Sequence, residues 1–246
     1  MDTSRIVPIF MCCARSDELL ECTFNSYVEY LYHRFATPII YFNSSENEDE
    51  NERFRRKIKE LFGELPYILH HNKIPHVYKA VQGASKTCLK YALTYAKRKG
   101  AWWNYLLFRK PVKFDGVMFC EDDITFSNVM YEAIEKFPLT SKTGFVTMYQ
   151  PENGYRLHAE NEIDVPVFYG TQCLVFPLDS LKKLCYNMIE SEEGYDRVWA
   201  KTLAGLGLKL YALDASYVQH NQTSSLLSGH SRTHSSGVFK FNLENL

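Results

Sequence analysis

Residues 114–124 read Phe-Asp-Gly-Val-Met-Phe-Cys-Glu-Asp-Asp-Ile and form the most informative segment of the chain. Its apolar part, residues 117–120, has the pattern of a buried strand, and Glu121, Asp122 and Asp123 follow directly. Such a carboxylate cluster is costly unless a positive partner neutralises it. Hard divalent cations take oxygen ligands and often bridge a carboxylate to a substrate phosphate. The stretch therefore predicts a metal site, with an acidic turn that caps the next helix as the alternative.

Strand-like and helix-like segments alternate on both sides of this stretch. The predicted strands are residues 6–13, 38–42, 67–69, 117–120, 146–149, 172–176 and 208–213. Helical spacing of apolar residues predicts helices at 20–31, 54–62, from 82–86 onward, and at 129–137, 178–189 and 195–204. This alternation predicts an α/β fold with a mainly parallel central sheet flanked by helices.

The polar residues that follow the predicted strands share one expected location. In such sheets ligands bind beyond the carboxyl ends of the strands. Arg15, Asn43 and the acidic residues 121–123 each come just after a strand, so we expect one ligand to reach all of them. Arg15 suits a phosphate or a base edge, although a surface arginine near a helix start is the alternative.

Composition limits the classes of protein that the chain can belong to. With 246 residues it is long enough for one domain with a full core. A net charge of -1 gives no general attraction to nucleic acid, so a nucleic-acid partner is not expected. The seven cysteines lack CxxC spacing, which favours buried reduced thiols over a zinc or redox site. No run approaches ~20 apolar residues and no signal peptide is evident, so we expect a cytoplasmic chain, or one whose membrane anchor has been removed.

Four further segments carry candidate chemistry. Residues 83–86, Gly-Ala-Ser-Lys, place Lys86 at a predicted helix start, where backbone N–H groups favour anions. Residues 192–199 place Asp196 at another helix start, where it could be a general base on a hydroxyl or a plain cap. His220 ends a strand-like segment and is either a metal or phosphate ligand or a structural histidine. Residues 221–237, rich in Ser and His, predict a mobile loop that is either a lid over a diphosphate or a disordered tail.

Taken together and in this order, these segments resemble the GT-A glycosyltransferases. The likeness, from about residue 6 to 239, is to N-acetylglucosaminyltransferase I and related family 2-like inverting enzymes. It implies a Rossmann-like GT-A fold and transfer of a sugar from a UDP-sugar, with a GDP-sugar as second choice. The acceptor would be a glycan or another hydroxyl-bearing molecule. The cofactor implied is Mn²⁺ or Mg²⁺.

The resemblance also implies roles for single residues of the nucleotide-binding part. Glu121-Asp122-Asp123 matches the DXD-type motif of the family. Asp123 would be the direct metal ligand, with Glu121 beside it, and Asp122 would contact the donor sugar or nucleotide. Arg15 and Asn43 would contact the nucleotide, although an Asp is more usual at the position of Asn43.

In the later part of the chain the resemblance implies a base and a loop that closes over the donor. Asp196, followed by Gly-Leu-Gly-Leu-Lys at residues 205–209, would be the catalytic base of an inverting reaction. His220 is a candidate third metal ligand, and Ser231 and Arg232 would contact the donor phosphates. Residues 170–172, Gly-Thr-Gln, are expected to line the donor-sugar or acceptor pocket.

The expected organisation is one GT-A domain over residues 1–246. It would have a nucleotide-binding half up to about residue 123 and an acceptor half, with a flexible C-terminal loop, over 124–246. One alternative is a binding module for sugar nucleotides without turnover. A second is a sugar-1-phosphate nucleotidyltransferase, against which residues 12–15, Cys-Cys-Ala-Arg, lack the expected glycines. A third is a transferase that acts on a modified DNA base.

Overall fold

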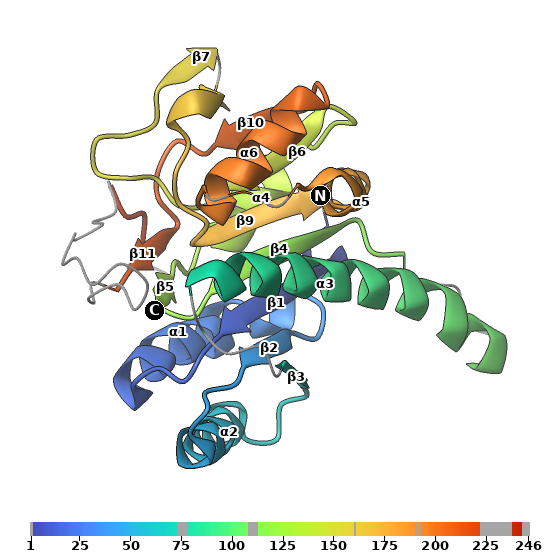
Figure 1. Cartoon of the computed structure of the whole chain (residues 1–246), viewed down its shortest axis with the longest axis vertical. Coiled ribbons are helices and arrows are strands. Elements are labelled where there is room, and N and C mark those ends of the chain that lie inside the picture. Colours follow the sequence, from blue (N-terminus) through green and yellow to red (C-terminus); the bar gives the residue numbers. More distant parts are fainter. Residues whose placement is uncertain are drawn as a thin grey trace.

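A nine-stranded sheet runs through the structure, a computed structural model that describes residues 2–72, 78–107, 113–159, 161–189, 191, 193–221 and 238–242. The strand order is β3-β2-β1-β4-β9-β6-β10-β8-β7, and β11 and β5 form a separate two-stranded sheet (Figure 1). The strands are β1 (Ile6–Cys12), β2 (Ile39–Asn43), β3 (Ile68–Asn72), β4 (Gly116–Glu121), β5 (Ile124–Phe126), β6 (Thr143–Thr147), β7 (Leu157–Ala159), β8 (Glu162–Ile163), β9 (Cys173–Pro177), β10 (Lys209–Ala212) and β11 (Val218–His220). The helices are η1 (Thr3–Arg5), α1 (Asp17–Tyr30), η2 (Tyr32–Arg34), α2 (Glu48–Phe62), α3 (Tyr78–Leu107), α4 (Met130–Lys136), η3 (Val165–Val167), α5 (Leu178–Asn187) and α6 (Tyr195–Gly205).

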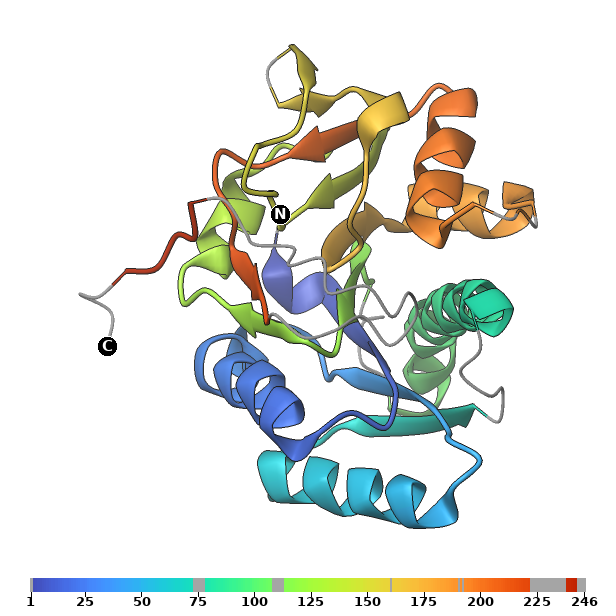
Figure 2. The same cartoon turned by 60° about the vertical axis from the view of Figure 1, so that its left-hand side comes forward.

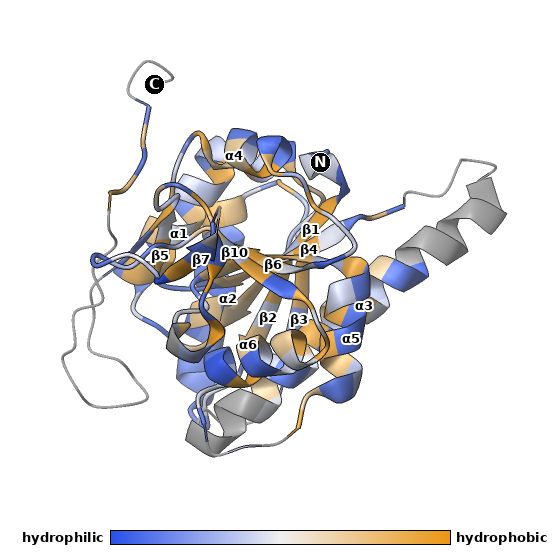
Figure 3. Cartoon of the chain, turned by 90° about the horizontal axis from the view of Figure 1, so that it is seen from above, coloured by the Kyte–Doolittle hydropathy of each residue, from blue (hydrophilic) through white to orange (hydrophobic). Residues whose placement is uncertain are grey.

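Helices cover both faces of the large sheet (Figure 2). Side chains alternate along β1: Val7 and Ile9 lie in one buried cluster, with residues of α3, α5 and α6, while Ile6 and Phe10 lie in the other, with residues of α1, α2 and α4. Because both faces are covered, every residue of β1 is buried. This is why the sequence shows a continuous apolar run there instead of alternation. Hydrophobic residues accordingly gather along the strands (Figure 3).

Most strands of the large sheet point the same way, as the sequence predicts. β1 is parallel to both β2 and β4, β2 is parallel to β3, and β10 is parallel to β6. The carboxyl ends of β1, β2 and β4 therefore meet at one edge. β9 runs antiparallel between β4 and β6, and Cys173 at its start pairs with Cys120 near the end of β4. This reversal brings the residues that precede β9 to the same edge.

Two local expectations are corrected by the structure. Helix α3 begins at Tyr78, so residues 83–86 lie inside the helix and not at its start, and the anion-binding argument for them does not hold. The acidic residues 121–123 are followed by β5, and α4 begins only at Met130, so these carboxylates do not cap a helix. The alternative reading of the acidic segment is thereby wrong.

Other expectations concern cysteines, the membrane and the division of the chain. All seven cysteines are free thiols, and six are buried as predicted, whereas Cys22 is exposed. None of the helices in the described part of the chain is long and apolar enough to cross a membrane. The large sheet includes strands from both expected halves, and the division near residue 123 stays a prediction.

Candidate metal and donor site

The acidic segment lies at the carboxyl edge of the sheet, where β4 ends at Glu121. Asp122 and Asp123 follow in the turn to β5 and are only 2% and 4% exposed. β11 pairs with β5 in antiparallel fashion, with His220 opposite Ile124, and this pairing carries His220 to the same place. One ligand atom each of Glu121, Asp123 and His220 lies within 4.8 Å of the other two. The three predicted metal ligands are thus brought together, while their role as ligands stays a prediction.

The residues at this point fit a divalent cation. Asp123 Oδ1 is buried and has no hydrogen-bond partner among the residues that the structure describes. Asp123 Oδ2 lies 3.5 Å from His220 Nε2, close to the ~3 Å between adjacent ligands of a small octahedral ion. Two carboxylates suit Mg²⁺ and Mn²⁺ alike, whereas an imidazole nitrogen suits the transition metal better than oxygen-seeking Mg²⁺. The donor set therefore favours Mn²⁺ over Mg²⁺.

The three carboxylates of the acidic segment differ in the direction of their pKa shifts. Burial raises the pKa of Glu121 and of Asp122, and repulsion from Asp123 adds to both shifts. For Asp123 burial also acts to raise the pKa, but the hydrogen bond from His220 and the Arg15 guanidinium outweigh it and lower the pKa below its usual range. Among the described residues, Arg15 contacts Asp122 and Asp123 but not Glu121, and a bound cation would favour the ionised form of the segment.

Arg15 connects the end of β1 to the acidic segment. Its Nε donates to Asp122 Oδ1 at 2.8 Å, and its Nη2 lies 3.0 Å from Asp123 Oδ2. The backbone N–H of Cys13 donates to Asp122 Oδ2 at 2.8 Å, so both oxygens of Asp122 accept from the loop after β1. These contacts hold the loop after β1 against the end of β4. The predicted contacts of Arg15 and Asp122 with the donor stay predictions.

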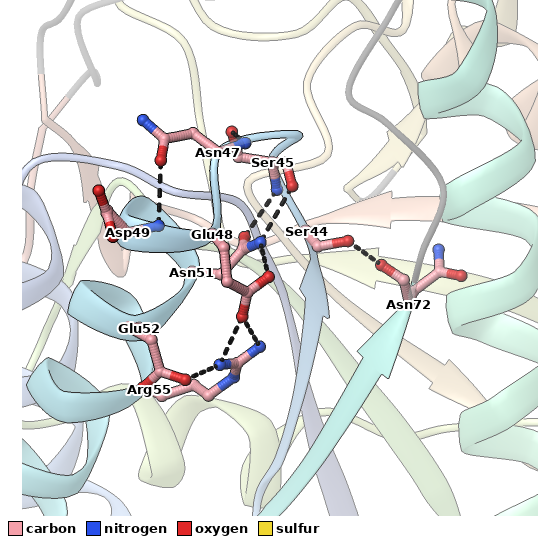
Figure 4. A network of polar contacts seen from close by, with 9 residues as sticks. All are labelled: Ser44, Ser45, Asn47, Glu48, Asp49, Asn51, Glu52, Arg55 and Asn72. Atoms are coloured by element: carbon pink, nitrogen blue, oxygen red, sulfur yellow. Dashed lines mark hydrogen bonds and ion pairs between the residues drawn. The ribbon is translucent and has the colours of Figure 1, made fainter.

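Asn43 ends β2 on the same side of the sheet and is 2% exposed. Its Oδ1 accepts from Asn72 Nδ2 at 2.8 Å, which ties the ends of β2 and β3. The loop that follows is held by further bonds (Figure 4): Ser44 Oγ donates to Asn72 O at 3.0 Å, and Asn51 bonds the backbone of Ser45 through both ends of its amide. The loop after β2 is thus held by side-chain bonds, and the predicted contact of Asn43 with the base stays a prediction.

Asp196 lies in the first turn of α6 and directly follows Tyr195, whose side chain contacts Glu121. Asp196 Oδ2 accepts from the backbone N–H of Gly170 at 3.2 Å, and Tyr195 Oη donates to Glu121 Oε1 at 2.6 Å. Thr171 Oγ1 donates to the same Glu121 oxygen at 2.5 Å. Asp196 is thus adjacent in sequence to a residue that contacts Glu121, and its role as a base stays a prediction. The sequence analysis did not single out Tyr195, because its reach from α6 to β4 depends on tertiary structure.

Three other residues are predicted to contact the donor. One of them, Lys86, is bonded elsewhere in the structure, and the other two lie outside the described residues. Lys86 lies within α3, and its Nζ donates to the backbone oxygen of Met188 at 3.2 Å. It is therefore engaged by the end of α5 and not presented by a helix N-terminus. Ser231 and Arg232, with the predicted lid, lie outside the described residues.

Known structures resemble this chain in fold, although no protein-family model and no curated protein matches its sequence. One similar structure is residues 1–349 of TarS from S. aureus, with a TM-score of 0.53 and 11% identity, covering 87% of this chain and 59% of TarS 1–349. Another is the mannosyltransferase PcManGT from Pyrobaculum calidifontis in complex with GDP-Man and Mn²⁺, with a TM-score of 0.58 and 13% identity, covering 90% of this chain and 58% of that one. This chain thus spans less than two thirds of each. The likeness shows a shared GT-A-like α/β fold.

Proposed function

We propose that the protein is a metal-dependent glycosyltransferase that moves a sugar from a nucleoside diphosphate sugar to an acceptor hydroxyl, with inversion. The observation that carries the proposal is the meeting of Glu121, Asp123 and His220 within 4.8 Å at the carboxyl edge of the sheet. The unpaired Oδ1 of Asp123 and the fold shared with a mannosyltransferase support it. The same edge is where ligands of such sheets bind.

Each residue of the site has a role in this proposal. Asp123, Glu121 and His220 hold the cation, which supplies Lewis-acid stabilisation of the leaving nucleoside diphosphate. Arg15 holds Asp122 and Asp123 in place and adds a fixed positive charge beside the diphosphate. Asp196 accepts the proton of the acceptor hydroxyl as that oxygen attacks the anomeric carbon.

The donor base is a separate part of the proposal. The resemblance in sequence implies a UDP-sugar, with Asn43 on the base, whereas the mannosyltransferase of similar fold was solved with GDP-Man. The ordered loop after β2 is the part of the site that would discriminate between the two bases. Both donor classes therefore belong in the test. The acceptor is a glycan or another hydroxyl-bearing molecule.

Turnover of donors tests this function. The purified chain is incubated with a panel of UDP- and GDP-sugars, with Mn²⁺ or with EDTA, beside the Asp123→Asn variant, which keeps the side-chain shape. Slow hydrolysis of one donor that requires metal and is lost in the variant is the expected result. Absence of turnover, together with nucleotide binding of equal affinity with Mn²⁺ and with EDTA, would instead support a binding module. Pyrophosphate release from a nucleoside triphosphate and a sugar 1-phosphate would support a nucleotidyltransferase.

A further inference from the structure

Glu121 receives two hydroxyl hydrogen bonds on a single oxygen. Thr171 Oγ1 donates to Oε1 at 2.5 Å and Tyr195 Oη donates to it at 2.6 Å, and the two hydroxyl oxygens lie 3.0 Å apart. Thr171 Oγ1 is also within donating distance of Tyr195 Oη. Since each hydroxyl has one hydrogen to give, both hydroxyls donate to the carboxylate when Thr171 uses its shorter contact, which is to Glu121. Oε1 is therefore held by hydroxyl donors, and Oε2 takes part in neither of these bonds.

The two donors come from segments that are themselves tied together. Thr171 follows Gly170 in the loop before β9, and Tyr195 precedes Asp196 at the start of α6. The backbone N–H of Gly170 donates to Asp196 Oδ2 at 3.2 Å. We call residues 170–171 and 195–196 the bracket. The two pairs are joined by this bond and by the contact between the Thr171 and Tyr195 hydroxyls, and they are joined to Glu121 by two further bonds.

Gly170 allows the loop to take this course. Its φ is +102°, a region that disfavours residues with a side chain. A Cβ at this position would also lie 2.5 Å from Gln172 Oε1. Gly170 thus permits a backbone conformation that puts Thr171 within reach of Glu121.

We propose that Thr171 and Tyr195 are positioning residues that orient Glu121 for the cation, so that metal affinity depends on the bracket. This inference rests on the cation site of the proposed function. A carboxylate ligand held by hydroxyl donors loses no rotamer freedom when the metal binds, and loss of such an outer partner typically weakens metal binding about 10- to 100-fold. The bracket also connects Asp196 to Glu121, because Asp196 adjoins Tyr195 and accepts from Gly170, which adjoins Thr171.

Direct Mn²⁺ binding, followed by the electron paramagnetic resonance signal of the free ion, tests the inference without turnover. Tyr195→Phe and Thr171→Val each remove one hydroxyl and keep the side-chain volume, and each should weaken Mn²⁺ binding about tenfold. Thr171→Ser keeps the hydroxyl and should bind as the unchanged chain does. Tyr32→Phe is the matched control, because Tyr32 Oη donates to the backbone oxygen of Pro66 at an exposed position away from the site. Thermal unfolding of every variant confirms that each is folded.

The outcomes separate this inference from the proposed function. If the unchanged chain binds Mn²⁺ and the Phe and Val variants bind it equally well, the positioning role is wrong and the cation site stands. If Thr171→Ser loses as much affinity as Thr171→Val, packing and not the hydroxyl matters, and the inference is again overturned. A chain that binds no Mn²⁺ at all would overturn both.

Discussion

Replacement of Arg15 by leucine should lower the free energy of unfolding more than replacement of a surface arginine does. Asp122 is 2% exposed and the Arg15 side chain 15%, and the guanidinium contacts two buried carboxylates at 2.8 and 3.0 Å. Removal of one partner of a buried ion pair leaves an unpaired charge and costs about 3–5 kcal/mol of unfolding free energy. For a chain of this length, that loss corresponds to a fall in Tm of roughly 6–20 °C.

The matched control is Arg5→Leu. Arg5 pairs with Asp115 at 2.7 Å, but the two side chains are 38% and 31% exposed, and such a pair contributes less than about 1 kcal/mol. Urea unfolding followed by intrinsic fluorescence compares the two variants, with Trp199 as a fully buried reporter. Adding Asp122→Asn to Arg15→Leu should restore part of the loss, since the amide removes the unpaired charge. Equal losses for the two leucine variants, or a double variant less stable than Arg15→Leu, would refute the reasoning.

Three further predictions concern the site. Asp196→Asn keeps an oxygen for the Gly170 N–H but cannot take a proton, so kcat should fall about 10²- to 10⁴-fold while the donor affinity measured by calorimetry stays unchanged. An unchanged kcat in this variant would exclude Asp196 as the base. His220→Ala removes the only imidazole of the ligand set, so equilibrium dialysis should show weaker Mn²⁺ binding and a smaller preference for Mn²⁺ over Mg²⁺; an unaltered preference would mean that His220 is not a ligand. Gly170→Ala puts a Cβ 2.5 Å from Gln172 Oε1 at a φ of +102°, so differential scanning calorimetry should show that the free energy of unfolding falls by about 1–3 kcal/mol. A variant as stable as the unchanged chain would show that the loop relaxes to accept the side chain.

The parts of the fold that follow from local pattern were predictable from the sequence. Buried parallel strands need apolar residues on both faces, which makes β1 and β4 visible as continuous apolar runs that end in polar residues. Gly63, with a φ of +54°, ends α2 as expected of a glycine after a helix. The sequence misplaces the start of α3, because Gly83 resembles a helix-opening signal, whereas a glycine inside a long helix is tolerated.

The site was only partly predictable, because its parts come from separate segments. Glu121 and Asp123 stand out as carboxylates after an apolar strand, and His220 as a histidine at the end of a short one. Their meeting depends on the pairing of β11 with β5, which no spacing in the sequence reveals. Tyr195 shows the same limit, since its hydroxyl reaches Glu121 across 74 residues of chain. The reversal of β9 was equally hidden, because an apolar run does not indicate strand direction.

Calorimetric titration of UDP and of GDP into the purified chain, with saturating Mn²⁺ and then with EDTA, examines whether the cation and the donor share this site. The claim is that Glu121, Asp123 and His220 hold a cation against the diphosphate of the donor. We predict that one of the two nucleotides binds in Mn²⁺, and that EDTA or Asp123→Asn abolishes the binding. Nucleotide binding of equal strength with Mn²⁺, with EDTA and in the variant would contradict the claim.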